Sequence, residues 1–174
     1  NNMKINEKLD SGPVSNVYKI KLKSKDNSKE ISEKLSLLAS DKISDEIDNI
    51  LEDKVKFIDQ DHSKATYAKK IEKTEGKINW NDEASIILGK VNGLFPSPGA
   101  FFKFKGERYK ILKAEIGNGR GKAGEVLNNE LEIVCKNNKS IKVQEIQRQG
   151  KNPQKTSEFM LGSQIKKGTL ISDA

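Results

Sequence analysis

The first 53 residues show the hydrophobic patterns of one strand and two helices. Residues 17–22 alternate apolar and polar side chains, which predicts a half-buried strand after the turn at residues 10–13. Apolar residues at helical spacing predict one helix from Ser28, which suits the N-cap position, and a second from Ser44 or Asp45. One strand and two helices bury too little apolar surface to fold alone. We therefore interpret this part as a piece of an α/β layer.

The remainder of the chain predicts a helix followed by a small β domain. Residues 54–79 have scattered apolar positions typical of a basic linker, whereas residues 81–92 predict a helix with Asn81 as its N-cap. A short helix is expected near residues 157–162 and a closing strand at residues 168–171. The predicted strands between them are residues 100–104, 108–115, 124–127, 131–135 and 139–146. Short strands at this spacing are typical of a small closed barrel.

The charge changes sign along the chain. The 174 residues carry 32 Lys+Arg and 25 Asp+Glu, a formal net charge of +7. Residues 1–53 hold 9 basic and 11 acidic residues, net −2, whereas residues 54–174 hold 23 and 14, net +9. A small barrel with basic side chains on one face is a common platform for nucleic acid, which it holds mainly through phosphates. No row of surface aromatic residues can be identified, which favours structured RNA held by shape and charge.

Composition excludes several classes of protein. The longest apolar runs, such as residues 86–88, fall far short of the roughly 18 to 20 residues needed to cross a bilayer. The single cysteine, Cys135, cannot form an internal disulfide, and the single histidine, His62, leaves no Cys/His set for zinc. We therefore expect a cytoplasmic protein with no membrane association and no metal.

Some residues could carry chemistry by themselves, and each has a simpler interpretation. The Asp10 carboxylate would project from a strand end, where open α/β sheets bind ligands, but an ordinary Asx turn is the alternative. His62 lies in a polar linker with no nucleophile nearby in sequence. Residues 117–121 are rich in glycine, but no helix or Gly-Lys-Ser/Thr follows, which favours a mobile hairpin loop over a phosphate cradle.

A series of short motifs is spaced along the chain. They are Leu-Asp-Ser-Gly-Pro at 9–13, Ala-Thr-Tyr-Ala-Lys-Lys-Ile at 65–71, Ile-Asn-Trp at 78–80, Pro-Ser-Pro-Gly-Ala at 96–100, Gln-Arg-Gln-Gly-Lys at 147–151 and Phe-Met-Leu-Gly at 159–162. In this order the series resembles the C-terminal portion of the bacterial methionyl-tRNA formyltransferase family, over essentially all 174 residues. The departures from the family pattern are Asn79 for the usual Asp, Ser97 for the usual Trp, and Asn92 where an arginine is common.

The resemblance implies a fold and an activity. It implies an α/β remnant of a Rossmann-like formyltransferase domain at residues 1–54, a basic linker at 55–76, and an OB-like small β-barrel C-terminal domain at 77–174 that helps to hold tRNA. It further implies formyl transfer from 10-formyltetrahydrofolate to the amino group of methionyl initiator tRNA. We expect the enzyme to be a monomer.

The resemblance also carries site residues onto this chain. Of the family's catalytic Asn, His and Asp, only the Asp has a matching position, Asp10. The Asn and His would lie upstream of Asn1, so we expect the chain alone to be inactive. The loop that would line part of the folate pocket comprises Asn6, Glu7, Lys8, Leu9 and Asp10. The candidates for contact with tRNA phosphates are Lys69, Lys70, Lys73, Arg148 and Lys151, for which a solvated charged face is the alternative.

Two other functions remain open. A sugar N-formyltransferase would share the α/β domain but would not bind RNA. The basic linker and the Gln-x-x-Gly-Lys motif near the C-terminus argue against this function. A stand-alone RNA-binding module derived from the barrel would need no catalytic residues. The codons before Asn1 would distinguish this module from part of an enzyme.

Overall fold

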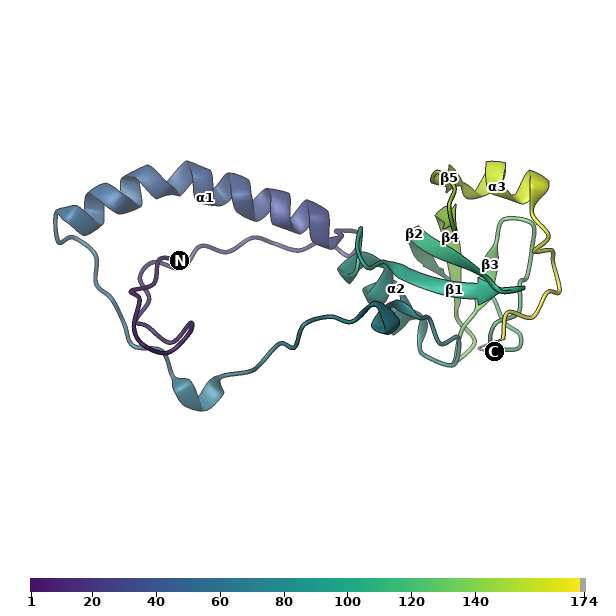
Figure 1. Cartoon of the computed structure of the whole chain (residues 1–174), viewed down its shortest axis with the longest axis horizontal. Coiled ribbons are helices and arrows are strands. Elements are labelled where there is room, and N and C mark those ends of the chain that lie inside the picture. The colour runs from purple at the N-terminus through teal and green to yellow at the C-terminus, as the bar shows by residue number, and fades with distance from the viewer. Residues whose placement is uncertain (173–174) are drawn as a thin grey trace. The chain divides into compact units, whose positions relative to one another are not determined.

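The computed structural model describes residues 1–172 and divides into two compact units (Figure 1). The first unit comprises residues 1–23 and 30–70, and the second comprises residues 24–29 and the chain from residue 71 onward. No helix among the described residues is long and apolar enough to span a membrane.

The first unit contains one long helix rather than a strand and two helices. Helix α1 (Ser28–Leu51) begins at the predicted residue but runs through the predicted second start, because no glycine or proline interrupts it. The predicted strand at residues 17–22 is wrong. Among the described residues this segment has no partner strand, and Val17 and Leu22 are each 60% exposed. Only isolated bridges join Val14 to Met3 and to Ile58.

A buried carboxylate ties the start of the chain to α1. Glu46 is 4% exposed and accepts hydrogen bonds from Tyr18 Oη at 2.5 Å, Asn16 Nδ2 at 2.9 Å and Asn2 Nδ2 at 3.0 Å. These bonds, chiefly the one from Tyr18, lower the pKa of Glu46. The ionised carboxylate therefore remains satisfied despite its burial.

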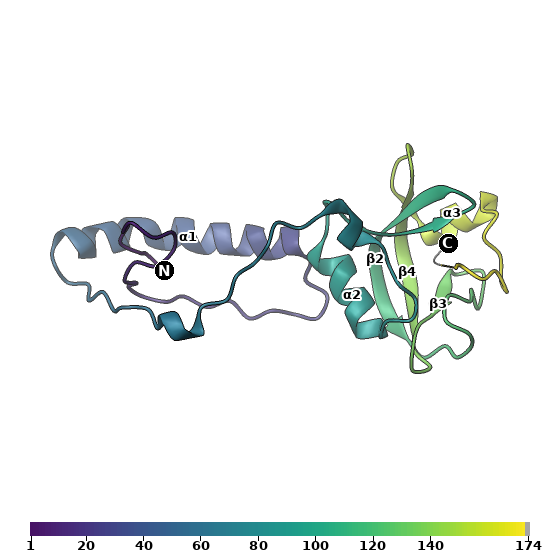
Figure 2. The same cartoon turned by 60° about the horizontal axis from the view of Figure 1, so that its bottom comes forward.

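The second unit is one antiparallel sheet covered by helices. The elements are 3-10 helix η2 (Lys73–Gly76), α2 (Ala84–Gly93), β1 (Ala100–Phe104), β2 (Glu107–Gly117), β3 (Glu132–Val134), β4 (Ser140–Arg148), β5 (Gln154–Lys155) and α3 (Thr156–Gly162). The sheet order is β1-β2-β4-β3; β3 pairs with residues 140–142 of β4, and β5 pairs with residues 145–146 of the same strand. Helix α2 packs against β2 and β4 (Figure 2), and α3 packs against β4 and β5 (Figure 1).

The sheet is open, so the predicted OB-like barrel is not confirmed. Strands β1 and β3 lie at opposite ends of the hydrogen-bonded order, and no described strand joins them. The predicted strands at residues 124–127 and 168–171 form only isolated bridges, which join Glu125 to Leu170 and Val126 to Ile133. Strand β3 has three residues, which is too short to continue the ladder around a closed barrel. The other predicted strands are present with slightly shifted ends.

A row of aromatic rings forms the centre of the second unit. Trp80 lies 5.8 Å from Phe102, Phe102 stacks on Tyr109 at 5.4 Å, and Tyr109 meets the edge of Phe159 at 5.8 Å. All four residues are at least 93% buried, and together they join the segment before α2 to β1, β2 and α3. Edge-to-face and offset contacts of this kind stabilise a core beyond the area that they bury.

The single cysteine, Cys135, is buried in the second unit. Its side chain is 2% exposed, and burial raises the pKa of the thiol to about 12. It packs as a small apolar residue. We expect a disulfide reagent such as DTNB to label Cys135 only in the unfolded chain. Rapid labelling under native conditions would contradict the burial of Cys135 directly after β3.

Two glycine substitutions are expected to have opposite effects on stability. Gly124 has a φ of +84°, and a Cβ atom there would lie 2.3 Å from the carbonyl oxygen of Ile171. We expect Gly124→Ala to lower the free energy of unfolding by about 1 to 3 kcal/mol. Gly89 lies on the exposed side of α2 with open space around it, so Gly89→Ala should raise that free energy by about 0.5 to 1 kcal/mol. Urea denaturation followed by Trp80 fluorescence measures both, and equal effects would contradict the close approach at Gly124.

Candidate nucleic-acid interface

The loop that carries Asp10 is a self-contained turn on the first unit. The Oδ1 atom of Asn6 accepts hydrogen bonds from the backbone nitrogen of Lys8 at 3.2 Å and from Ser11 Oγ at 2.8 Å. Gln60 Nε2 donates to the carbonyl oxygen of Asp10 at 3.0 Å, and Asp10 has a left-handed φ of 54°. All five predicted folate-loop residues, 6–10, are exposed. The turn presents the Asp10 carboxylate to solvent.

The predicted tRNA contacts are divided between the two units. Lys69 and Lys70 lie on an extended, exposed segment of the first unit, whereas Lys73 begins η2 in the second. A capping box fixes η2, with the backbone nitrogen of Glu72 donating to Glu75 Oε1 at 2.6 Å. Lys73 is therefore on a formed turn, and the other two lysines are on irregular backbone.

Arg148 is held at the end of β4 by a carboxylate. Its Nη2 atom lies 2.5 Å from Glu107 Oε1, and Tyr109 Oη donates to Glu107 Oε2 at 2.9 Å. The hydrogen bond from Arg148, followed by the one from Tyr109, lowers the pKa of Glu107. Burial, and then the bond to Glu107, raises the pKa of Tyr109, which keeps it a neutral donor. The charge of Arg148 is thus largely compensated within the protein.

A polar cleft of about 590 Å³ opens beside this ion pair. Arg148 and Lys151 both line it, and the turn holds them together because the Lys151 nitrogen donates to the Arg148 carbonyl at 3.0 Å. Glu107 and Glu158 also line the cleft, and Phe104, Tyr109 and Phe159 supply aromatic walls. The structure therefore brings two of the five predicted tRNA contacts to one cleft of mixed charge.

Two cations on the outer face of β2, Arg108 and Lys110, were not among the predicted contacts. Arg108 and Lys110 alternate along β2 with the buried Tyr109 and Ile111, so their side chains lie on the opposite face of the sheet from the aromatic row. They line a second cleft of about 200 Å³ with residues 147–150. One signal could have found Arg108: it is one of only three arginines among 32 basic residues.

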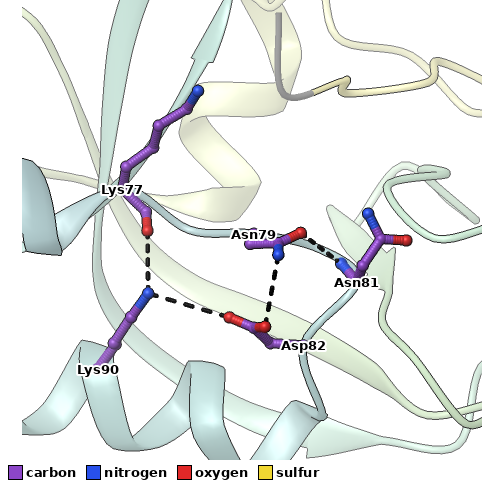
Figure 3. Close-up of polar contacts among 5 residues, drawn as sticks. All are labelled: Lys77, Asn79, Asn81, Asp82 and Lys90. Atoms are coloured by element: carbon purple, nitrogen blue, oxygen red, sulfur yellow. Dashed lines mark hydrogen bonds and ion pairs between the residues drawn. The ribbon is translucent and has the colours of Figure 1, made fainter.

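The departures from the family pattern have structural roles here. Figure 3 shows Asn79 Oδ1 accepting from the backbone nitrogen of Asn81 at 2.9 Å, and Lys90 reaching from α2 to the carbonyl of Lys77 at 3.1 Å and to Asp82 at 4.0 Å. The side chain of Asn79 thus organises the turn before α2. The predicted cap at Asn81 is wrong, because α2 starts later, with Glu83 at the N-cap position. The turn at residues 79–82 occupies the stretch where the sequence pattern placed the first helical residues.

Other residues of these motifs serve packing and turns. Trp80 is 2% exposed and packs within the core. The peptide bonds before Pro96 and Pro98 are both cis, and the Gly99 nitrogen donates to the Leu94 carbonyl at 2.9 Å across this turn. Asn92, which stands where an arginine is common, donates from Nδ2 to the Ser24 carbonyl at 3.3 Å.

Comparison with curated proteins finds several relatives of the same description. Methionyl-tRNA formyltransferase of Pelagibacter ubique (strain HTCC1062) is 64% identical over 171 residues, which cover 98% of this chain and 55% of that protein. Methionyl-tRNA formyltransferase of Thermodesulfovibrio yellowstonii is 33% identical over 95% of this chain and 54% of that protein. The chain therefore spans about half the length of these curated relatives.

Solved structures with a similar fold include HypX from Aquifex aeolicus. One HypX variant has a TM-score of 0.66 at 18% identity, with 92% of this chain and 30% of that chain covered. A HypX structure in complex with tetrahydrofolic acid has a TM-score of 0.63 at 19% identity, with 92% and 29% covered. At this identity the likeness concerns the fold alone.

A protein-family comparison gives the assignment. Residues 70–164 match the model described as "Formyl transferase, C-terminal domain", which is more than half of the chain and includes η2, α2, the sheet and α3. With its antiparallel sheet and helices, the chain belongs to the formyl transferase family, of which it contains the C-terminal domain.

Proposed function

We propose that this chain is the C-terminal part of a methionyl-tRNA formyltransferase. The enzyme transfers the formyl group of 10-formyltetrahydrofolate to the amino group of methionyl initiator tRNA. The observation that carries the proposal is the 64% identity, over 98% of this chain, to the Pelagibacter ubique protein of that name. The proposal includes a monomeric, cytoplasmic enzyme whose reaction uses no metal.

The chemistry requires groups that hold the formyl oxygen and move a proton. The neutral amine attacks the formyl carbon, a new carbon–nitrogen bond forms, and the bond from that carbon to the folate nitrogen breaks. The amine loses one proton, and the folate nitrogen gains one. A hydrogen-bond donor stabilises the oxyanion of the tetrahedral intermediate, and a general base and acid move the proton. We assign Asp10 to orient a histidine or a water in this transfer.

The surface of the first unit supports a larger formyltransferase domain. Several of its apolar side chains are exposed, with Leu37 at 72%, Leu51 at 76% and Leu9 at 92%. A folded domain rarely leaves so many large apolar residues in water. We propose that further chain completes a Rossmann-like domain around residues 1–54. In this proposal Asn6, Glu7, Lys8 and Leu9 line its folate pocket beside Asp10.

The charge of the chain supports a role in holding RNA. In the proposal, residues 55–76 form the linker and residues 77–174 the tRNA-binding domain. Residues 54–174 carry a net charge of +9, and affinity for RNA comes mainly from neutralised phosphates. We assign Lys69, Lys70, Lys73 and Lys151 to phosphate contacts, with Arg148 contributing less because Glu107 compensates its charge.

A chimera tests the enzymatic role. The unmatched N-terminal part of the Pelagibacter ubique relative, joined to this chain, is expected to formylate methionyl-tRNA, whereas the 174 residues alone are not. Asp10→Asn in the chimera should lower kcat by about 100-fold or more, because a group that assists proton transfer usually raises the rate by at least that factor. Formylation of radiolabelled methionyl-tRNA measures both.

Asp59→Asn provides the matched control, because Asp59 is an exposed carboxylate of the same unit outside the predicted site. Its activity should stay within twofold of the parent. Formyl transfer by the chain alone, or equal activity of the two Asp→Asn variants, would contradict the proposal.

The linker lysines are expected to give salt-dependent RNA binding. The 174-residue chain should bind methionyl initiator tRNA with an affinity that falls steeply with salt, because binding releases counterions from the phosphates. Replacing Lys69, Lys70 and Lys73 together by Gln should weaken binding by about tenfold or more and flatten the salt dependence. Fluorescence anisotropy at several salt concentrations measures the affinity.

A matched triple variant distinguishes site from total charge. Lys122, Lys136 and Lys167 are exposed lysines of the second unit outside the predicted contacts. Their replacement by Gln should weaken tRNA binding clearly less than the linker-lysine variant does. Absent or salt-insensitive binding would argue against a tRNA enzyme and favour the sugar N-formyltransferase.

A further inference from the structure

We propose that Arg108 and Lys110, on the outer face of β2, form a binding cleft for a phosphate of the RNA backbone. This inference rests on the proposed tRNA-binding function and adds a site that the sequence motifs do not contain. The cleft has a volume of about 200 Å³ and is lined by Arg108, Lys110, Gln147, Arg148, Gln149 and Gly150. Pockets for drug-sized molecules begin at about 300 Å³, so this cleft suits a small anion.

Arg108 is fixed before any ligand arrives. Its guanidinium carbon lies 3.7 Å from the centre of the Phe101 ring, a cation–π contact that Phe101 supports because it is itself 93% buried. Its Nη2 atom donates to the Pro98 carbonyl at 3.4 Å. The stack and this bond restrict the side chain, so less conformational entropy is lost when it binds an anion.

Arg108 also keeps a donor without a protein acceptor. Its Nε atom is buried and makes no hydrogen bond to any described residue. Such an unsatisfied donor is costly and calls for an explanation in the folded protein. A phosphate at the cleft would pair with the part of this half-buried guanidinium that remains accessible, since guanidinium and phosphate match in a forked geometry.

Lys110 is held beside Arg108 by a glycine turn. A Cβ atom on Gly99 would lie 2.5 Å from Lys110 Cδ, so the lysine chain lies across the backbone only because residue 99 is glycine. Lys110 Nζ donates to the Pro96 carbonyl at 3.4 Å. Burial, followed by repulsion from Arg108, lowers the pKa of Lys110. An anion between these cations would relieve the repulsion.

The surroundings favour an anion over a protein carboxylate partner. No described carboxylate forms an ion pair with Arg108 or Lys110, whereas Arg148 is already paired with Glu107. Lys103 lies directly across from Arg108 in the β1–β2 register, which adds an exposed cation to the two half-buried ones on the same face. The row of cations at two-residue spacing fits successive phosphates of a backbone better than a single small ligand.

The last wall of the cleft is the turn after β4. The Gln149 nitrogen donates to the Arg108 carbonyl at 2.9 Å, and Gln147 pairs with Lys110 across the strands. Gly150 has a φ of +71°, which turns the chain toward Lys151. Arg148 lines both this cleft and the 590 Å³ cleft, so the two are adjacent on the second unit.

Single substitutions in the 174-residue chain test the cleft. Arg108→Gln is expected to weaken binding of methionyl initiator tRNA about tenfold and to reduce the salt slope by about 0.7 to 0.9, the loss of one phosphate contact. Lys110→Gln should give a smaller loss in the same direction, and Arg108→Lys should recover part of the affinity. Arg120→Gln, at an exposed arginine outside the cleft, should change affinity by less than twofold. Fluorescence anisotropy titrations give these values, and Trp80 fluorescence on heating checks that each variant folds.

The outcomes separate this inference from the proposed function. It is overturned if Arg108→Gln and Lys110→Gln both bind as the parent does, or if Arg120→Gln loses as much affinity. Loss of binding in the linker-lysine variant alone leaves the tRNA enzyme standing and overturns the cleft. Arg108-dependent RNA binding with an inactive chimera supports the cleft and overturns the enzyme. Equally tight, Arg108-dependent binding of polyglutamate would overturn the assignment to phosphate.

Discussion

The row of aromatic rings from Trp80 to Phe159 is the constraint on which the second unit depends. It fixes which face of β1 and β2 points inward, because Phe102 and Tyr109 can reach one another and Phe159 only from that face. Strand periodicity then places Arg108 and Lys110 on the outer face. A one-residue slip in register would exchange the two sets, so core packing and surface charge are specified together.

The two kinds of basic residue in this chain differ in preorganisation. Lys69 and Lys70 lie on irregular, exposed backbone, so an RNA would order them at an entropic cost. Arg108 is held on the ring of Phe101 and therefore loses less conformational entropy when it binds. The linker lysines therefore suit long-range attraction of RNA, which salt screens, whereas the cleft suits a defined contact.

Much of the second unit could be predicted from the sequence, because strand alternation and glycine or asparagine turns are local signals. The open form of the sheet could not be predicted from the sequence, because the pairing of β3 depends on contacts between distant segments. In the first unit, residues 17–22 have the alternation of a strand, but no described strand pairs with them, so the local pattern predicted a strand that does not form. The motif resemblance proposed Arg148 and Lys151 as contacts, whereas Arg108 became a candidate only from the structure, because its fixed position depends on Phe101 and Pro98.

Amide chemical shifts measure, residue by residue, whether RNA contacts the outer face of β1 and β2. Titration of methionyl initiator tRNA into the ¹⁵N-labelled chain should shift or broaden the amides of residues 99–110 and 147–151. The amides of the loop at residues 117–121 should change little. Changes confined to that loop, or to residues outside the β1–β2 face and the turn after β4, would contradict the account.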